Sequence, residues 1–575
     1  MTRNRVVALA TEHPPGSRAQ PLPTSLQGYL ILRATAPVWL RVGAADMGPV
    51  ARDANSILFP GGERLLQVPP GASHFRVRAD ECRAYVQLEG VNAAPDPPQP
   101  EPEGMQWAPN NPTALPIVPG GAGWGMNTDA CFGRDEADDG LARAWRHIAV
   151  TNLNSDGPGS LREALTAEGP RVVTFWVSGV IDLHDLDDDD RDIKVTSGDL
   201  YVAGETAPAP GIVVYGAQLL IQVTAKNTVF SHFANFQYPY QDKNKQDSRG
   251  DPVNHFVPEG ETPQHSNIVH ANMCYGWTND EGGDAFRGCH DLTFYQTLFI
   301  EGLNNTDNLE NDNHGFGPIV SCEKISTRAN FARCGFIHNQ ARNPSTSAPL
   351  MSVANCLIYD CWQRGIELSS IDNHATKTNV EGNIFIDGPM GADDAIFIQD
   401  GGGGILNDSS TYYVAENRGL GYDDSSQGAL VSNGPGTMVS SRIADAHPPG
   451  LVVTRIGDDR EEFARLVARH VGPWPAHRQP VIQRVLDHLE ARLTGTGDQG
   501  GELLYPEDIG GMPALDENTI DHTEGEDPMP GVTSSDEQTV GEAAREIQPS
   551  GYTAFEEWLD RKRAALMPAD AVRID

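Results

Sequence analysis

The sequence is poor in positively charged residues. It holds 42 Lys and Arg against 79 Asp and Glu over 575 residues, a formal net charge of −37. Such a surface repels nucleic acids and anionic membranes at long range, so we expect no nucleic-acid partner. A site for any anionic ligand would therefore need local cations, either Arg and Lys side chains or a bound metal.

Long apolar segments are also missing. The sequence contains no run of about 18 apolar residues, so we predict no membrane span. The first residues, MTRNRVVALATEHPPG, hold only a short apolar run and no cleavage site of the usual form, which does not suit a secretory signal. A protein with this N-terminus that works outside the cell is therefore expected to leave it by another route, such as the release of virions from a lysed host cell.

Cysteine is scarce, and none of the eight residues forms a CxxC pair of the kind found in metal sites. Cys334 and Cys356 occupy matching points of neighbouring repeats, and Cys361 lies nearby. We predict stacked, reduced thiols inside a solenoid, because free cysteine is among the most buried residue types. A disulfide in one of these pairs is the alternative.

The chain divides into four segments by composition. Residues 1–91 hold six strand-like runs punctuated by Gly, Pro, Asn and Asp, which predict a small β-sandwich or barrel. Residues 92–114 form a Pro-rich linker with an extended, semi-rigid spacer at 92–104. Residues 115–435 carry weak repeats. Residues 436–575 form a helical and acidic extension with two amphipathic stretches and a final helix.

The repeats within 115–435 predict a solenoid. TLFIEG at 297, CGFIHN at 334, CLIYDC at 356 and NIFIDG at 383 align as rungs, and repeats of this length suit parallel β-helix coils. The helix predicted in SLREALTAE would cap the first rung. A long loop at 304–318 interrupts the spacing, and long loops on a rigid scaffold often carry binding surfaces.

Six segments, taken in chain order, resemble the bacterial pectate lyases that fold as a right-handed parallel β-helix. They are PGGAGWG at 119, VTNLNSDGPGSLREAL at 150, VAGETAPAPGI at 202, SNIVHANMCYGWTNDE at 266, EGLNN at 301 and HNQARNP at 338. The resemblance covers about 115–565. It implies a protein dominated by β-structure: a right-handed parallel β-helix, joined here to a small N-terminal β domain and a helical C-terminal extension.

The resemblance implies calcium-dependent β-elimination on uronic acid polymers. A base removes the proton beside the carboxylate, and a metal ion on that carboxylate stabilises the enolate-like charge. Asp280 and Asp284, just after YGW, resemble the family's paired calcium ligands, and we add Asp251 and Glu281 to the predicted Ca²⁺ set. A solvated acidic turn is the alternative.

Arg342, in ARNP, resembles the family's catalytic arginine, which acts as the base. Because arginine is effectively always protonated, a bidentate clamp on the substrate carboxylate is the alternative role. We predict that His314, His338 and Arg364 bind substrate.

Three positions depart from the family's pattern. Ala271 and Asn272 stand where the family usually has Asp-His, and Ser345 stands where a second arginine is often found. We expect these changes to remove polar groups from the groove and to weaken or abolish catalysis.

Our leading functional hypothesis is a bacteriophage virion spike or fibre that binds acidic host-surface polysaccharide and cleaves it if catalysis survives. The N-terminal domain would attach to other virion proteins, with a homotrimer as the expected oligomer. The extra β domain and the missing signal favour this hypothesis. The first alternative is a free, secreted pectate-lyase-like enzyme. The second is a purely structural virion protein with a non-catalytic β-helix.

Overall fold

The computed structural model of the chain describes residues 115–567 apart from short gaps, and within 1–114 it describes the strands alone. The gaps fall at 223, 239–249, 258–265, 286–288, 305–313, 322–326, 371–373, 392–393, 402–403 and 498. No described helix is long and apolar enough to cross a membrane.

The strands of the N-terminal segment form two antiparallel sheets of four strands each. The six predicted runs are all strands, and two further strands, β1 and β2, precede them. One sheet contains β1 (Arg5–Ala10), β8 (Ala84–Val91), β3 (Tyr29–Ala34) and β6 (Gly62–Gln67); the other contains β2 (Gln20–Pro21), β7 (His74–Arg78), β4 (Val38–Gly43) and β5 (Ile57–Phe59).

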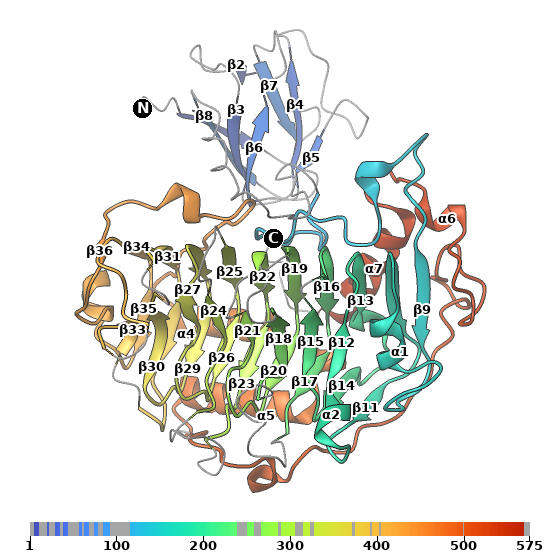
Figure 1. Ribbon diagram of the computed structural model, residues 1–575. Helices are drawn as coiled ribbons and strands as arrows, with labels where there is room; N and C mark the ends of the chain where they lie inside the picture. The colour runs from blue at the N-terminus through green and yellow to red at the C-terminus, as the bar shows by residue number, and fades with distance from the viewer. Residues whose placement is uncertain are drawn as a thin grey trace.

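The rest of the chain coils into three parallel sheets of 11, 9 and 8 strands (Figure 1). Successive turns add one strand to each sheet, which matches a right-handed parallel β-helix. The 11-stranded sheet contains, in spatial order, β9 (Arg146–Val150), β10 (Arg171–Phe175), β13 (Leu200–Ala203), β16 (Thr228–Ser231), β19 (Ser266–Ala271), β22 (His290–Tyr295), β25 (Arg328–Ala332), β28 (Leu350–Ala354), β31 (Lys377–Glu381), β34 (Thr411–Ala415) and β36 (Thr437–Met438).

The other two sheets complete each turn of the coil. The 9-stranded sheet contains β11 (Gly179–Asp182), β14 (Ile212–Tyr215), β17 (Ala234–Phe236), β20 (Cys274–Gly276), β23 (Leu298–Ile300), β26 (Gly335–Ile337), β29 (Leu357–Tyr359), β32 (Ile384–Ile386) and β35 (Arg418–Leu420). The 8-stranded sheet contains β12 (Ile193–Val195), β15 (Leu219–Gln222), β18 (Val253–Phe256), β21 (Asp284–Ala285), β24 (Ile319–Ser321), β27 (Ser345–Ser347), β30 (Arg364–Leu368) and β33 (Asp394–Ile398).

The predicted rungs are confirmed by the strand register. Leu298, Gly335, Leu357 and Ile384 pair in succession across β23, β26, β29 and β32. The four repeated segments therefore stack as neighbours in the 9-stranded sheet.

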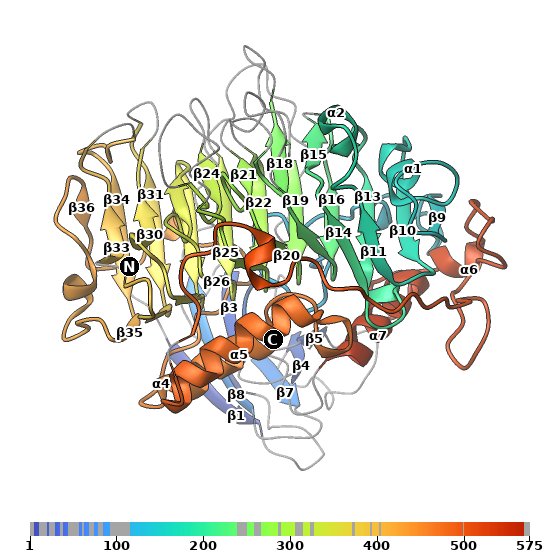
Figure 2. The same ribbon diagram turned by 90° about the horizontal axis from the view of Figure 1, so that it is seen from below.

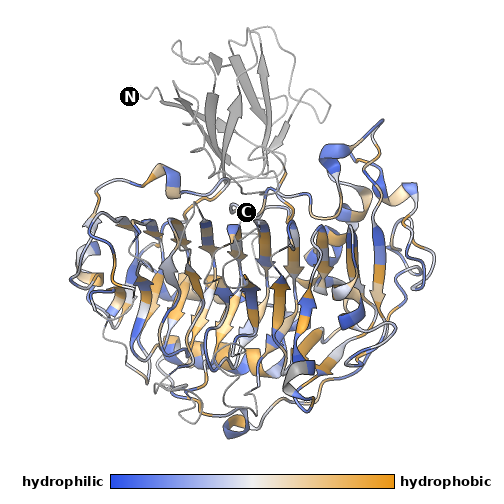
Figure 3. Cartoon of the chain, viewed as in Figure 1, coloured by the Kyte–Doolittle hydropathy of each residue, from blue (hydrophilic) through white to orange (hydrophobic). Residues whose placement is uncertain are grey.

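The interior of the coil is apolar and stacked from turn to turn. Figure 3 shows hydrophobic residues concentrated along the strands. Phe294 and Phe331 stack with ring centroids 4.8 Å apart, and burying each such side chain stabilises the fold by about 1.5–3 kcal/mol. The backbone N–H of Cys334 donates to Sγ of Cys356 at 3.4 Å. Cys334, Cys356 and Cys361 are buried in the central core and form no disulfide among the described residues, which matches the predicted stacking of buried thiols.

The C-terminal extension covers the outer face of the 9-stranded sheet. Helices α4 (Arg460–His470) and α5 (Pro480–Thr494) lie along this face (Figure 2). Their apolar residues share one buried cluster with the strands beneath. These helices were predicted from their amphipathic pattern. The other α-helices in the described part of the chain are α1 (Leu161–Thr166), α2 (Asp188–Arg191), α6 (Glu542–Arg545) and α7 (Ala554–Leu566), with α1 beside the first strands as the predicted cap.

A second apolar cluster covers the 11-stranded sheet, where α7 and residues 117–132 pack on its outer face. The outer face of the 8-stranded sheet differs. Its interior side chains join the central core, but the alternating positions include Asn254, Asp284, Ser345 and Glu367, which make polar contacts. Among the described residues, this is the sheet whose outer face carries no buried apolar cluster, so it is where a polar ligand could lie.

Candidate functional site

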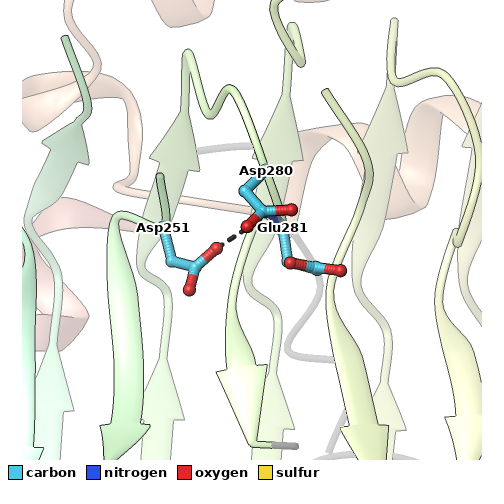
Figure 4. Close-up of side chains that lie close together, drawn as sticks. All are labelled: Asp251, Asp280 and Glu281. Carbon is cyan, nitrogen blue, oxygen red and sulfur yellow. Dashed lines mark hydrogen bonds between the residues drawn. The ribbon is translucent and has the colours of Figure 1, made fainter. Parts of the chain in front are cut away.

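Three carboxylates meet beside the 8-stranded sheet. Asp251 lies in the turn before β18, and Asp280 and Glu281 lie in the turn before β21 (Figure 4). One oxygen of each lies within 4.8 Å of the others. The backbone N–H of Glu281 donates to Oδ1 of Asp251 at 2.9 Å, which joins the two turns. The structure thus brings together three of the four predicted calcium ligands.

The fourth predicted ligand, Asp284, lies one step away and is connected through Asn254. The amide Nδ2 of Asn254 donates to Asp251 at 3.0 Å and to Asp284 at 2.9 Å. Asn254 was not singled out from the sequence. Its position three residues after Asp251, at the start of a strand, was the available signal.

Electrostatic repulsion is concentrated at Asp251, whose side chain is almost fully buried. Burial raises the pKa of Asp251 well above its ordinary value, and the negative charges of Asp280 and Asp284 raise it further. Asn254 and Arg342 oppose this rise. A cation held by these carboxylates would relieve the repulsion.

The donor set fits calcium. Ca²⁺ takes six to eight oxygen ligands from flexible carboxylates, carbonyls and water. Asp251, Asp280 and Glu281 supply such oxygens from two neighbouring turns, and within the described residues no histidine nitrogen or cysteine sulfur joins the group.

Arg342 reaches this cluster from two turns away. Its guanidinium forms an ion pair with Glu281 and lies over the ring of Phe316, with Cζ 4.5 Å from the ring centroid. Burial lowers the pKa of Arg342 from its ordinary value, while Glu367, Asp280 and Asp251 oppose the change. A cation–π contact of this kind contributes about 0.5–2 kcal/mol.

The strand registers align these groups into a ladder. Counting back from the paired strands places Asp251, Glu281, Phe316, Arg342 and Arg364 at the same position of five successive turns. Adjacent strands are about 4.8 Å apart. The ladder therefore changes from negative to positive charge along the axis of the coil, with an aromatic ring between.

Arg364 occupies the turn beyond Arg342 and has its own acidic partner. Its Nε lies 2.9 Å from Oε2 of Glu367, and its guanidinium covers the ring of Phe397 at 4.6 Å. The structure places this predicted substrate-binding residue next to Arg342, away from the carboxylate cluster.

His314 lies at the same side of the coil as Phe316. The two rings are 4.8 Å apart. Its Nδ1 atom is buried without a hydrogen-bond partner among the described residues, and its near neighbours at 305–313 lie outside them.

His338 is held away from the carboxylates, beneath α5. Its Nδ1 contacts Asp360 at 2.6 Å and its Nε2 contacts His488 at 3.2 Å, and the residue is buried. The structure does not bring His338 to the other predicted site residues. Sequence reasoning missed the contact because His488 lies 150 residues further along the chain.

The placement expected for Ala271 and Asn272 is wrong. Ala271 ends β19 and packs in the apolar cluster on the outer face of the 11-stranded sheet. The amide of Asn272 donates to the carbonyls of His470 and Gly472 at 2.9 and 3.2 Å. Both residues therefore belong to covered faces, and their substitution removes nothing from the outer face of the 8-stranded sheet.

Ser345 is the departure that does lie beside the ladder. It starts β27, pairs in register with Ile319 and Glu367, and shares a hydrogen bond of 3.1 Å with Ser369. The second arginine that the family often has would have stood on the outer face of this sheet.

No protein-family model matches the chain. The chain is 24% identical over 456 residues to a protein named probable pectate lyase C from Aspergillus flavus, across 78% of this chain and 94% of that protein. A protein of the same name from Aspergillus terreus is 25% identical over 457 residues, with the same coverage. These likenesses support a pectate-lyase-like relationship and favour the free-enzyme hypothesis over the virion spike.

Solved structures with similar coils include Jun a 1, the major allergen of cedar pollen, with a TM-score of 0.42, 14% identity, and 62% of this chain and 93% of that chain covered. A pectate lyase from Bacillus sp. N165 in complex with trigalacturonate has a TM-score of 0.38, 12% identity, and 60% and 98% coverage.

Proposed function

We propose that the chain is a calcium-dependent lyase that cleaves uronic acid polymers by β-elimination. One observation carries the proposal: Arg342 lies over Phe316 and contacts a cluster of three carboxylates on the outer side of the 8-stranded sheet. The two cationic rungs beyond the cluster suit an anionic chain, which the overall charge of −37 would otherwise repel. A polymeric substrate implies that the protein acts outside the cell.

Calcium, when bound by Asp251, Asp280 and Glu281, supplies positive charge that holds the substrate carboxylate and stabilises the enolate-like charge. The residues of the chain orient the sugar. Arg342 and Arg364 pair with carboxylates along the polymer, since a guanidinium fork matches a carboxylate in two hydrogen bonds.

Arg342 is the residue that we assign as the base. Arg342 first loses one proton to solvent; a nitrogen of its neutral guanidine then takes the C5 proton, the C5 electron pair forms the C4–C5 double bond, and the C4–O bond breaks. The leaving oxygen takes a proton from solvent. Burial favours this role because it lowers the pKa of Arg342, so that a neutral guanidine is formed at less cost than in water.

The test measures ultraviolet absorbance of the new double bond on polygalacturonate with calcium. Arg342→Lys keeps the charge and loses the planar fork. As a base variant it should abolish product formation while much of the binding remains; as a clamp variant it should weaken binding and turnover in step. Arg364→Lys is the matched control, because Arg364 is assigned to bind a substrate carboxylate and not to act as the base. Absence of the unsaturated product from wild type on a panel of uronate polymers would refute the proposal.

The virion-spike hypothesis, with a homotrimer and other virion proteins as partners, stays a prediction that depends on the N-terminal β domain. Finding the full chain in purified phage particles would favour it, and the β-helix could act on an acidic glycan there as well. The likeness to fungal lyases makes the free enzyme our preferred reading.

A further inference from the structure

We infer that Glu281 is a positioning residue that makes the binding of a cation and the release of Arg342 one event. The inference rests on the proposed function, because it concerns the same site. It adds a role that neither the carboxylate cluster nor Arg342 has alone: the cation would free the arginine for substrate.

The first step is that Glu281 belongs to two groups at once. Its carboxylate lies within 4.8 Å of Asp251 and Asp280 in the cluster suited to a cation, and the same carboxylate forms the ion pair with Arg342. A cation drawn to the cluster would take up the negative charge of Glu281 and would also repel the guanidinium. Cation and Arg342 therefore compete for one carboxylate.

The second step is that Arg342 keeps its place when Glu281 leaves. The ring of Phe316 lies between the turns of Glu281 and Arg342, and the guanidinium covers that ring at 4.5 Å. A guanidinium that lies over a ring keeps its N–H donors at its edge, where a carboxylate can pair with them. Phe316 thus holds the arginine, and Glu281 is the carboxylate of the cluster that pairs with it, while the charge of Glu367 also acts on Arg342.

The third step is a built-in comparison one turn further on. Arg364 is also paired with a glutamate, Glu367, and also covers a ring, Phe397. Glu367 is not part of the carboxylate cluster. A cation at the cluster should therefore leave the Arg364 pair intact, which makes Arg364 the matched control.

The first experiment titrates calcium chloride alone into the full chain by calorimetry, using wild type, Arg342→Gln, Glu281→Gln, the double variant and Arg364→Gln. Removing Arg342 should tighten calcium binding by about tenfold, within the usual range of coupling between sites. In the Glu281→Gln background the same removal should change affinity far less. Equal effects of Arg342→Gln in both backgrounds would show a general charge effect and would overturn the inference, as would no effect at all.

The second experiment measures how readily phenylglyoxal labels Arg342, read by mass spectrometry with Arg364 as the internal reference. Calcium should raise the labelling of Arg342 several-fold relative to Arg364, and Glu281→Gln should label rapidly without calcium. Melting curves confirm that each variant is folded. Protection of Arg342 by calcium, or no change, contradicts the inference.

The outcomes separate from those of the proposed function. If calcium and Arg342 are coupled through Glu281 but no uronate polymer is cleaved, the lyase proposal fails and the coupling stands. If polygalacturonate is cleaved and the double-variant cycle shows no coupling, the inference fails alone. No calcium binding by wild type would sink the inference and the metal assignment together.

Discussion

Replacing Glu205 by Gln should stabilise the protein above neutral pH. Glu205 lies in a 3-10 helix (Gly204–Thr206) on which α7 packs, and it is buried. Burial raises the pKa of Glu205 from its ordinary value of 4.5 to about 7, although the hydroxyl of Tyr201, which donates to it at 2.9 Å, and the charge of Arg563 oppose the rise.

The sign of the pH effect follows from this shift. An acid whose folded pKa is raised holds its proton more tightly in the folded state, so its contribution to stability is full below pH 4.5 and falls as pH rises to about 7. A shift of this size is worth about 3 kcal/mol, taken as an order of magnitude. Spread over about 450 residues, the loss corresponds to a melting temperature lower by roughly 3 °C.

The measurement must exclude the contribution of the neighbouring histidines to the pH dependence of stability. His232 lies 3.9 Å from Glu205, and burial lowers its pKa well below the ordinary value. Burial also lowers the pKa of His477, to about 4. Both add stability as pH rises to about 6.5, which opposes the effect of Glu205. The difference in melting temperature between wild type and Glu205→Gln, followed by calorimetry from pH 5 to pH 8, removes their contribution.

The expected difference is small at pH 5 and grows in favour of Glu205→Gln up to pH 8. Gln keeps the size of the side chain and an oxygen that can accept from Tyr201. If Glu205 were instead ionised and paired with Arg563 in the fold, the variant would be destabilised at pH 8, because breaking a buried pair costs about 3–5 kcal/mol. A variant less stable than wild type at pH 8 would therefore refute the reasoning.

Three further predictions concern the outer face of the 8-stranded sheet and the domain boundary. Calcium at one hundred times its dissociation constant should stabilise wild type by about 2.7 kcal/mol, and a calcium-induced rise in melting temperature that persists in the double variant Asp251→Asn with Asp280→Asn counts against the cluster. Trp362, a residue that is 38% exposed and lies two residues before Arg364, should contact sugar rings beyond that turn, so Trp362→Ala should weaken binding of long oligouronides more than short ones; equal losses would exclude this contact. Limited proteolysis should cut first within 92–104, and a first cut within 150–430 would contradict the predicted linker.

The coil itself could be predicted from the sequence because its repeats are local. TLFIEG, CGFIHN, CLIYDC and NIFIDG each carry one strand of the 9-stranded sheet, and the short buried run that they share aligns each segment with the next. The ladder of site residues could not be predicted in the same way. The turns that join its rungs differ in length, so Glu281 and Arg342, 61 residues apart, meet only once each strand is paired.

The sequence also could not predict on which face of the coil a residue lies. Asn272 and His338 each end a strand or follow one, and the sequence alone does not say which of three sheets comes next. Both lie under α4 and α5, which join the coil from more than 100 residues downstream. Helices that pack on the coil in this way decide which outer faces are buried and which stay exposed. Local sequence patterns carry no information about that packing.

The observed positions of Ala271 and Asn272 change the catalytic activity that we expect. A degraded catalyst was expected because Ala271, Asn272 and Ser345 depart from the lyase pattern. Two of these three lie on covered faces, where a small apolar residue and a backbone-binding amide satisfy their surroundings. Only Ser345 stands beside Arg342 and the carboxylate cluster. Because the proposed base contacts Glu281 and the three proposed metal ligands lie together, the remaining departure bears on how the polymer is bound, and a raised KM with turnover retained is the expected consequence.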